Sequence, residues 1–276
     1  MNSVRSAASE LVKVRGTRRL AAANMCKELK TKMLRLLPPT CNGPTTNEED
    51  RTDDEVLKCT VKALQDGHVV AVPTDTIYGL ACLAQNSEAV RKIYAVKGRN
   101  GQKPLAICVR EIQDIYKYCK VEVKKELLDD LLPGPVTLVF QRSEALNSAL
   151  NPFTSLVGVR IPNHAFMRRL CQMCEEPLAL TSANVSAHTS TVEVHEFQEL
   201  WPHVAVVVDG GPIGDQSRLG STVVDLSVVD KYRIIRPGCR VKQEMPQILF
   251  PVPFLPRLMC WSANMDCQRT WGKNDL

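Results

Sequence analysis

Residues 68–80 read HVVAVPTDTIYGL, a short apolar run of strand length that passes directly into a polar loop. The run His68–Pro73 predicts a strand. Thr74, Asp75 and Thr76 follow it, so their hydroxyls and carboxylate are expected at the carboxyl end of that strand. In α/β sheets this edge is where ligands bind. The same residues also suit a capped turn, in which Thr and Asp bond the backbone.

Short apolar strands alternate with amphipathic helices on both sides of this stretch. Helices are expected at about 53–66, 87–97, 112–119, 124–132, 164–174 and 192–200, and strands at 68–73, 105–109, 136–140, 156–161, 178–181, 204–208, 223–226 and 232–236. Ser87 is the predicted N-cap of the second helix. The alternation predicts an α/β fold, a mixed sheet covered by helices.

The first 51 residues are interpreted as a basic leader and linker. Nine lysines and arginines lie within residues 5–35, against only Glu10 and Glu28 as acids. Alanine, serine and leucine fill the gaps, which is typical of a mitochondrial transit peptide, a basic amphipathic helix with few acids. A disordered basic tail is the alternative. Residues 38–50, PPTCNGPTTNEED, show no periodicity and predict a linker.

The folded body is expected over residues 52–240, and residues 241–276 are atypical. Four prolines lie between Pro246 and Pro256, and two of the chain's 3 tryptophans lie in this tail. Prolines at that density prevent a continuous helix, and the apolar residues lack the alternation of a strand. The tail is therefore predicted to be disordered.

Composition limits the class of protein. The chain has 276 residues, 44% hydrophobic and 24% charged, which is typical of a globular protein with a substantial core. No apolar stretch reaches the roughly 18 residues of a membrane-spanning helix. A net charge of +5 suits an anionic substrate or a loose association with RNA. The 11 cysteines, without a secretory signal, indicate free thiols, and the CxxC of Cys171 and Cys174 is read as apolar helix surface rather than a zinc site.

Two further loops carry candidate chemistry. The segment Lys97–Leu105, KGRNGQKPL, places three cations around a glycine-containing loop. An arginine guanidinium group can bind two phosphate oxygens at once. Thr181–Ser186, TSANVS, directly follows an apolar strand. The alternatives are a solvated basic loop and a polar turn. The chain has no GxxxxGK[ST] loop, GxGxxG, GxSxG or HExxH, so a nucleotide would need another kind of site.

Taken together, the motifs are specific. PTDTxYGLAC, KGRxxxKPL, PGPVTLV, GVRIPxH, LTSANxS, GSTVVDL and IIRPG occur in that order between about Val56 and Gly238. This series resembles the YrdC family of L-threonylcarbamoyladenylate synthases. The resemblance implies a single domain with a twisted open sheet, flanking helices and a positively charged concave surface.

The resemblance also assigns site residues. The KxR and SxN pairs of the family correspond to four residues expected to be catalytic: Lys97, Arg99, Ser182 and Asn184. Contacts to ATP are expected from Arg99, Lys103, Asn184 and Arg236. Threonine is expected to contact Thr76, Arg160, Ser182 and Ser221, with Arg160 suited to its carboxylate. Some relatives have a histidine where this chain has Cys108, so that residue has no assigned role.

The implied reaction converts ATP, L-threonine and bicarbonate into threonylcarbamoyl-AMP and pyrophosphate, the activated intermediate for a tRNA modification. It needs no enzyme nucleophile, so positioning and electrostatics are expected to carry the catalysis. Mg²⁺ is expected to bind through ATP, with no protein ligand. The family also implies a downstream tRNA threonylcarbamoyl-transferase machinery. A cytoplasmic and mitochondrial location is expected.

Two other function classes remain open from the residues. One is a double-stranded RNA-binding module without catalysis, although aromatic residues are only 5% and offer no stacking platform. Weak RNA binding is compatible with either reading. The other is a regulatory or carbamoyl-transfer domain on the same scaffold, because a fold does not determine a function.

Overall fold

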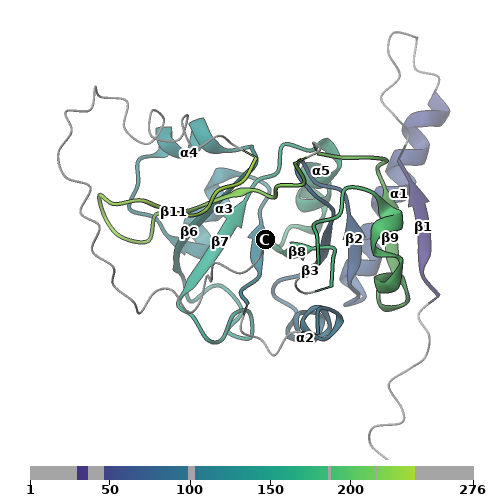
Figure 1. Cartoon of the computed structure of the whole chain (residues 1–276), viewed down its shortest axis with the longest axis horizontal. Helices are drawn as coiled ribbons and strands as arrows, with labels where there is room; N and C mark the ends of the chain where they lie inside the picture. Colours follow the sequence, from purple (N-terminus) through teal and green to yellow (C-terminus); the bar gives the residue numbers. More distant parts are fainter. Residues whose placement is uncertain (1–29, 37–46, 99–102, 186–187, 215–216, 240–276) are drawn as a thin grey trace, which may run out of the picture.

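The structure is a computed structural model that describes residues 30–36, 47–98, 103–185, 188–214 and 217–239. These residues form a single α/β domain around one open mixed sheet, as expected (Figure 1). The helices are α1 (Asn47–Gln65), α2 (Ser87–Val96), α3 (Ile112–Tyr118), α4 (Lys125–Leu131), α5 (Ala165–Cys174) and the 3₁₀ helix η1 (Val194–His203).

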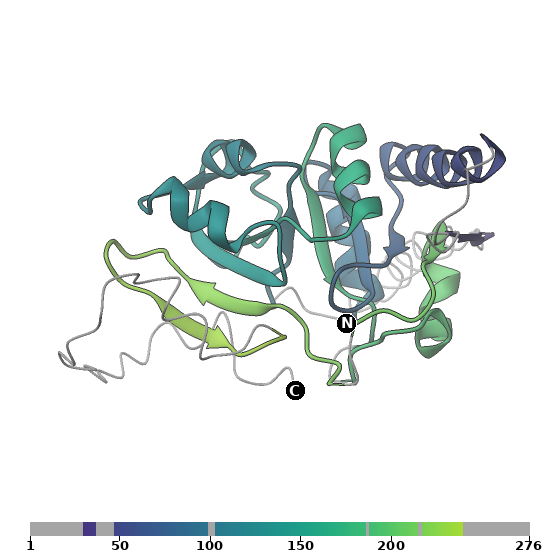
Figure 2. The ribbon, with the colours of Figure 1, turned by 90° about the horizontal axis from the view of Figure 1, so that it is seen from above.

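The sheet follows the order β1-β9-β2-β3-β8-β4-β7-β6-β10-β11, and β5 pairs with β6 beside this path. The strands are β1 (Lys32–Arg35), β2 (Val70–Val72), β3 (Gly79–Leu83), β4 (Ala106–Cys108), β5 (Cys119–Lys120), β6 (Val136–Arg142), β7 (Leu156–Arg160), β8 (Leu178–Ser182), β9 (Val206–Asp209), β10 (Thr222–Asp225) and β11 (Arg233–Arg236). Figure 2 shows the twist of the sheet, with the β10–β11 hairpin turned away from the strands at the other end.

The register of the central strands determines which loops meet. β3 is antiparallel to both of its neighbours, so Gly79 lies opposite Val72 on β2 and Ser182 on β8. The loop before β3 and the turn after β8 therefore emerge side by side. On the far side of β8, β4 pairs with β7 and places Cys108 beside Arg160.

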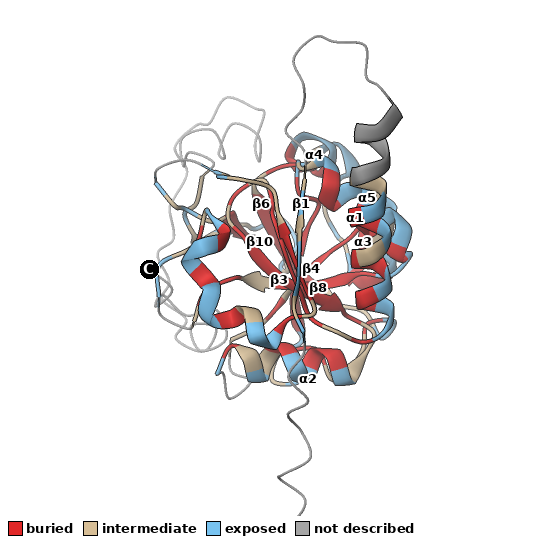
Figure 3. Ribbon diagram, turned by 90° about the vertical axis from the view of Figure 1, so that its right-hand side faces the viewer, coloured by how far each residue is buried: buried red, intermediate tan, exposed pale blue. Residues whose placement is uncertain are grey.

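Two of the hydrophobic clusters pack helices against the sheet. On β2, Ala71 belongs to a cluster that also includes residues of α2, α3, α4 and η1. Its neighbours Val70 and Val72 belong to a second cluster with α1 and α5. This alternation follows from the two-residue period of a strand. Figure 3 shows the buried strands between α2 and the layer that contains α1 and α5.

Several local expectations are wrong. Lys32–Arg35, expected within a basic helix, forms β1, which runs parallel to β9 and packs Leu34 against the second cluster. The first long helix begins at Asn47 rather than near residue 53. Asn86, not Ser87, is the N-cap of α2, because its side chain accepts a hydrogen bond from the Ala89 amide at 3.0 Å.

The polar loop after β2 is also shorter than expected. Gly79 already belongs to β3, a strand that the sequence pattern did not indicate. The helix expected at 192–200 is a 3₁₀ helix that extends to His203 and contains Pro202. Residues 1–29, which hold most of the basic leader, and residues 240–276, which hold the tail, lie outside the described residues, so both readings remain predictions.

Candidate functional site

The loop between β2 and β3 is organised by the Thr74 hydroxyl. Its oxygen accepts a hydrogen bond from the Thr76 amide at 3.1 Å and donates to the Ile77 carbonyl at 2.7 Å. The Thr76 hydroxyl lies 3.2 Å away and is buried. The expected capped turn is therefore formed by Thr74, whose hydroxyl bonds the backbone. The same turn keeps the Thr76 hydroxyl buried.

This loop adjoins the turn after β8. The Ala183 amide donates to the Tyr78 carbonyl at 2.8 Å, directly beside Ser182. Gly79 allows the close approach, because a Cβ there would lie 2.7 Å from Leu180 Cδ1. The PTDT and SxN segments are therefore neighbours in space, although they lie far apart in the sequence.

Lys97 joins the end of α2 to the same turn. It is the C-cap of α2 and only 1% exposed. Its Nζ donates to the Ser182 carbonyl at 2.7 Å and to Asn184 Oδ1 at 2.9 Å, and it also contacts the Asn184 carbonyl. The Ser182 hydroxyl donates to Asn184 Oδ1 as well. Three of the four expected catalytic residues thus form one largely buried network, in which Ser182 is partly exposed.

Arg160 at the end of β7 reaches the PTDT loop. Its Nη2 lies 2.6 Å from Asp75 Oδ1 and 3.4 Å from the Thr76 hydroxyl. The Asn163 amide donates to Asp75 Oδ2 at 2.9 Å. The expected threonine contacts Thr76 and Arg160 therefore lie together, and Asp75 joins them as a residue that the resemblance did not assign.

A third group lies at the β6–β10 end of the sheet. The Ser221 hydroxyl is 2.7 Å from that of Thr137, and both side chains are buried. Arg236 Nη2 donates to the Ser221 carbonyl at 3.1 Å. A Cβ on Gly220 would lie 3.3 Å from Arg236 Nη2 and 3.5 Å from Ile77 Cδ1, so this group adjoins the PTDT loop. Thr137 is a further residue that the sequence reasoning missed, although it lies within the PGPVTLV motif.

The basic loop is only partly described. Arg99 lies within residues 99–102, outside the described residues, and its assignment remains a prediction. Lys103 is half-buried just before β4. Of the predicted phosphate loop, only Lys97, Gly98 and residues 103–105 are therefore described.

The buried side chains of Tyr78 and Cys108 are neutral. Burial raises the pKa of the Tyr78 phenol to about 12, and its hydroxyl accepts from the Gly210 amide at 3.0 Å and donates to the Gly211 carbonyl at 2.7 Å. Burial likewise raises the pKa of the Cys108 thiol to about 12. A protonated thiol is a poor nucleophile and a poor metal ligand. Cys108 is therefore a packing residue beside Arg160.

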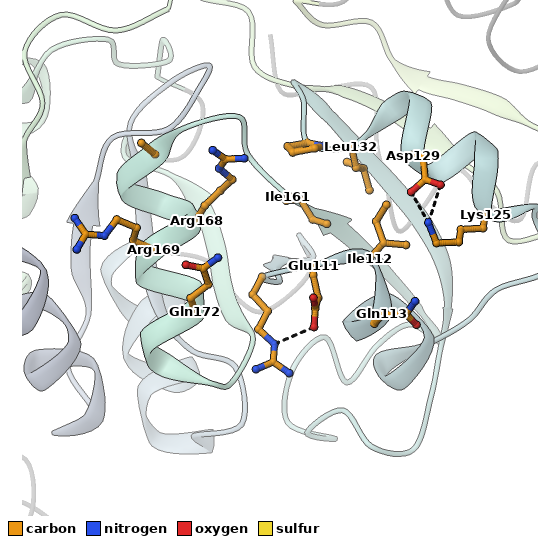
Figure 4. Close-up of a pocket in the computed structure, with 13 residues that line it drawn as sticks. Glu111, Ile112, Gln113, Lys125, Asp129, Leu132, Ile161, Arg168, Arg169 and Gln172 are labelled. Atoms are coloured by element: carbon orange, nitrogen blue, oxygen red, sulfur yellow. Dashed lines mark hydrogen bonds and ion pairs between the residues drawn. The ribbon is translucent and has the colours of Figure 1, made fainter. Parts of the chain in front are cut away.

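Neither of two depressions on the described surface is lined by Lys97, Ser182 or Asn184. The larger, about 680 Å³, lies between α3, α4 and α5 and is lined by none of the expected site residues that the structure describes (Figure 4). Its cations include Lys125, which pairs with Asp129, Arg110, which pairs with Glu111, and Arg169, which pairs with Asp54 on α1. The smaller, about 520 Å³, includes His188, whose carbonyl accepts from Asn184 Nδ2. We place the candidate site at the buried network because its polar groups converge from several loops, whereas the larger groove is a solvated surface.

The chain matches known proteins over the region that builds this site. The family model Sua5_yciO_yrdC, described as "Telomere recombination", matches residues 62–238. A Bos taurus protein named threonylcarbamoyl-AMP synthase is 55% identical over 230 residues, covering 82% of this chain and 83% of the relative. A Homo sapiens protein of the same name is 60% identical over 192 residues, covering 68% and 69%.

Solved structures show the same fold. P. abyssi Sua5 complexed with L-threonine has a TM-score of 0.67 and 27% identity, covering 79% of this chain and 60% of that one. Full-length HypF in the phosphate- and nucleotide-bound form has a TM-score of 0.57 and 26% identity, covering 65% and 28%.

Proposed function

The chain belongs to the Sua5/YciO/YrdC family, and on that premise we propose that it joins ATP, L-threonine and bicarbonate into threonylcarbamoyl-AMP and pyrophosphate. This makes it a nucleotidyltransferase that serves threonylcarbamoyladenosine modification of tRNA. One observation carries the proposal: relatives that are 55% and 60% identical are named threonylcarbamoyl-AMP synthase, and their similarity covers more than two thirds of both chains.

The threonine end of the site is proposed to lie around Arg160. Its guanidinium suits a carboxylate because it offers planar, paired donors. The Thr76 hydroxyl lies 3.4 Å from Arg160 Nη2 and supplies a polar partner within a buried environment. Ser182 and Ser221 are proposed to complete the pocket for the threonine hydroxyl. A P. abyssi Sua5 structure with L-threonine supports this choice of substrate.

The nucleotide end is proposed to lie around the SxN turn and the basic loop. Lys97 donates to the Ser182 and Asn184 carbonyls and to the Asn184 side chain, so it fixes the shape of this turn. Arg99, Lys103, Asn184 and Arg236 are proposed as contacts to ATP. Cations held here would neutralise the charge that develops at the α-phosphate.

The reaction then requires positioning rather than a protein nucleophile. The threonine amine takes up bicarbonate with loss of water, or carbon dioxide with loss of a proton, to give a carbamate. One carbamate oxygen then attacks the α-phosphate, and pyrophosphate leaves. Holding the carboxylate at Arg160 and the phosphates at the SxN turn converts this encounter into an intramolecular step.

Mg²⁺ is proposed to bind through the phosphates of ATP. No group of three or more His, Cys, Asp or Glu residues that could hold a metal occurs in the described ranges. The Asp75 carboxylate is engaged by Arg160 and the Asn163 amide. A cation that is held by the nucleotide needs no such group of protein ligands. Bound to ATP, Mg²⁺ would neutralise the negative charge of the phosphates.

The proposal extends to the downstream partner of the protein and to its location in the cell. The product would pass to a tRNA threonylcarbamoyl-transferase machinery, and the basic leader would direct part of the protein to mitochondria, with the remainder in the cytoplasm. None of the described helices is long and apolar enough to cross a membrane.

Pyrophosphate release tests the proposal. The full chain is incubated with ATP, Mg²⁺, bicarbonate and L-threonine, and each component is omitted in turn. We expect release only in the complete mixture, with threonylcarbamoyl-AMP detected by mass spectrometry. Steeply salt-dependent binding of double-stranded RNA without pyrophosphate release would instead favour the RNA-binding reading.

A further inference from the structure

The ion pair between Asp75 and Arg160 differs from the other ion pairs of the described chain in its burial. Their side chains are 7% and 6% exposed, and 85 residues separate them in the sequence. The pair connects the loop after β2 with the end of β7. An isolated buried charge is unfavourable, so a pair in this position must be well bonded to persist.

Asp75 is bonded at both oxygens. Oδ1 accepts from Arg160 Nη2 at 2.6 Å, and Oδ2 accepts from the Asn163 amide at 2.9 Å. The second bond attaches the carboxylate to the backbone that leads from β7 into α5. Asp75 therefore does not cap its own turn, which the Thr74 hydroxyl already does. It fixes the distance between two segments that both border the candidate site.

Arg160 keeps a donor that the ion pair does not use. Among the described residues, its Nε has no hydrogen-bond partner, although the atom is buried. A buried unsatisfied N–H is costly and is uncommon in native proteins. A guanidinium has five donors in a rigid plane. Fixing Nη2 on Asp75 therefore also fixes the direction in which Nε points.

We propose that Asp75 is a positioning residue that holds the Arg160 guanidinium by Nη2, so that its Nε–H donates to the carboxylate of the amino-acid substrate. The inference rests on the proposed function, in which Arg160 binds the threonine carboxylate. Asp75, the carboxylate of the PTDT motif, thus acts on Arg160 and does not itself contact threonine.

A competing role for Asp75 has the opposite consequence. If the carboxylate only occupied Arg160 until threonine replaced it, binding would have to release Asp75 from both Arg160 and the Asn163 amide. The released carboxylate would remain buried without its charge partner, which is strongly unfavourable. Binding at the Nε–H avoids that step and gives the unsatisfied donor a partner.

Asp75→Asn separates the two roles. The amide keeps the size of the carboxylate but has one acceptor oxygen, so either Arg160 Nη2 or the Asn163 amide loses its acceptor. The guanidinium is then less well oriented, and we expect KM for threonine to rise about 10–100-fold. KM for ATP and kcat at saturating threonine should change by less than about threefold. A threonine KM that is unchanged or lower would overturn the proposal, because a competitor or a purely structural residue gives that result.

Arg160→Lys provides the second arm of a double-mutant cycle. Lysine keeps the charge but lacks the planar fork that Asp75 orients. Asp75→Asn should then raise KM for threonine far less in the Arg160→Lys background than in the native chain. An equal fold-change in both backgrounds would show that Asp75 acts independently of Arg160 and would overturn the proposal.

Calorimetric binding of L-threonine separates this proposal from the proposed function. A native chain that binds threonine but releases no pyrophosphate would contradict the synthase function alone. An Asp75→Asn variant that binds threonine as tightly as the native chain would contradict the positioning role alone. If Asp75→Asn does not fold, Asp75→Glu retains the charge on a longer arm and should raise KM to a smaller extent. A native KM in that variant would overturn the proposal.

Discussion

The lysine and arginine side chains of the groove between α3, α4 and α5 that form ion pairs are exposed to solvent, whereas Lys97 and Arg160 of the candidate site are buried. Lys125 pairs with Asp129 one helical turn away, and these side chains are 50% and 47% exposed. Lys97 reaches Ser182 over 85 residues and is 1% exposed. Lys125 and Asp129 line a groove of about 680 Å³, yet their charges remain solvated and neutralise each other (Figure 4).

This difference shows which charged side chains are buried despite the free-energy cost of removing them from water. An exposed ion pair contributes roughly 0–1 kcal/mol and can occur on any helix surface. A buried charge is tolerated only with several well-placed partners, so its presence requires agreement between distant segments. Lys97 and Arg160 meet that condition, and both lie in motifs that the sequence resemblance assigned to the reaction.

Removing Lys97 should give the largest effect. Lys97→Met keeps the length of the side chain but leaves the Ser182 and Asn184 carbonyls without their buried donor. The SxN turn should lose its shape, and we expect pyrophosphate release to fall by about 100-fold or more. The melting temperature should also fall, because an unsatisfied buried group costs about 1–3 kcal/mol.

Lys125→Met is the matched control in the groove. Its partner Asp129 is exposed and can be solvated by water. We expect a rate within about twofold of the native chain. Comparable losses in the two variants would remove the distinction between the regions.

The choice of amino acid should give the next largest effect. Serine lacks the methyl group of threonine, a contact worth about 1–3 kcal/mol, and should be a poor substrate. Valine keeps the branched shape but leaves the polar groups around Thr76 and Ser182 without the substrate hydroxyl. Pyrophosphate release is compared for the three amino acids at equal concentration. Equal rates for valine and threonine would contradict the assigned pocket.

The ion pair between Glu196 and Arg218 is an intermediate case, and its removal should give the smallest effect. It joins segments 22 residues apart but is partly exposed. The hydrogen bond from Arg218 lowers the pKa of Glu196 below its ordinary 4.5. The pair should therefore stabilise the fold above pH 4.5 and lose that contribution as pH falls through the lower, folded-state value.

Melting of Glu196→Gln at several pH values measures this contribution. Near neutral pH the variant should melt slightly below the native chain, and the difference should disappear in acid. A difference that persists in acid would show that the ion pair is not its cause.

The sequence predicted the fold class, whereas the site residues were assigned from the resemblance of the motif series and remain predictions. The alternation of strands and helices was enough to predict the mixed sheet. It did not reveal β3, because Gly79–Leu83 follows a polar turn so closely that the strand resembled part of a loop. It also did not reveal β1, because four basic and apolar residues acquire a strand conformation only by pairing with β9.

The partners of the candidate site's side chains could not be predicted from local sequence patterns. Lys97 was expected to line the nucleotide site, yet its described donors hold the SxN turn. Asp75 was visible as a carboxylate at a strand end, but its partners Arg160 and the Asn163 amide lie more than eighty residues away. Such pairings depend on sheet register and on the course of loops, which local sequence patterns do not specify.

A crystal structure of the full chain with L-threonine and a non-hydrolysable ATP analogue tests the distinction between the two regions most directly. We predict that the threonine carboxylate lies within hydrogen-bond distance of Arg160, with Asp75 still bonded to Nη2, and that the triphosphate lies against the SxN turn and the basic loop. Threonine or nucleotide bound in the groove between α3, α4 and α5, with the Arg160 region empty, would contradict the account.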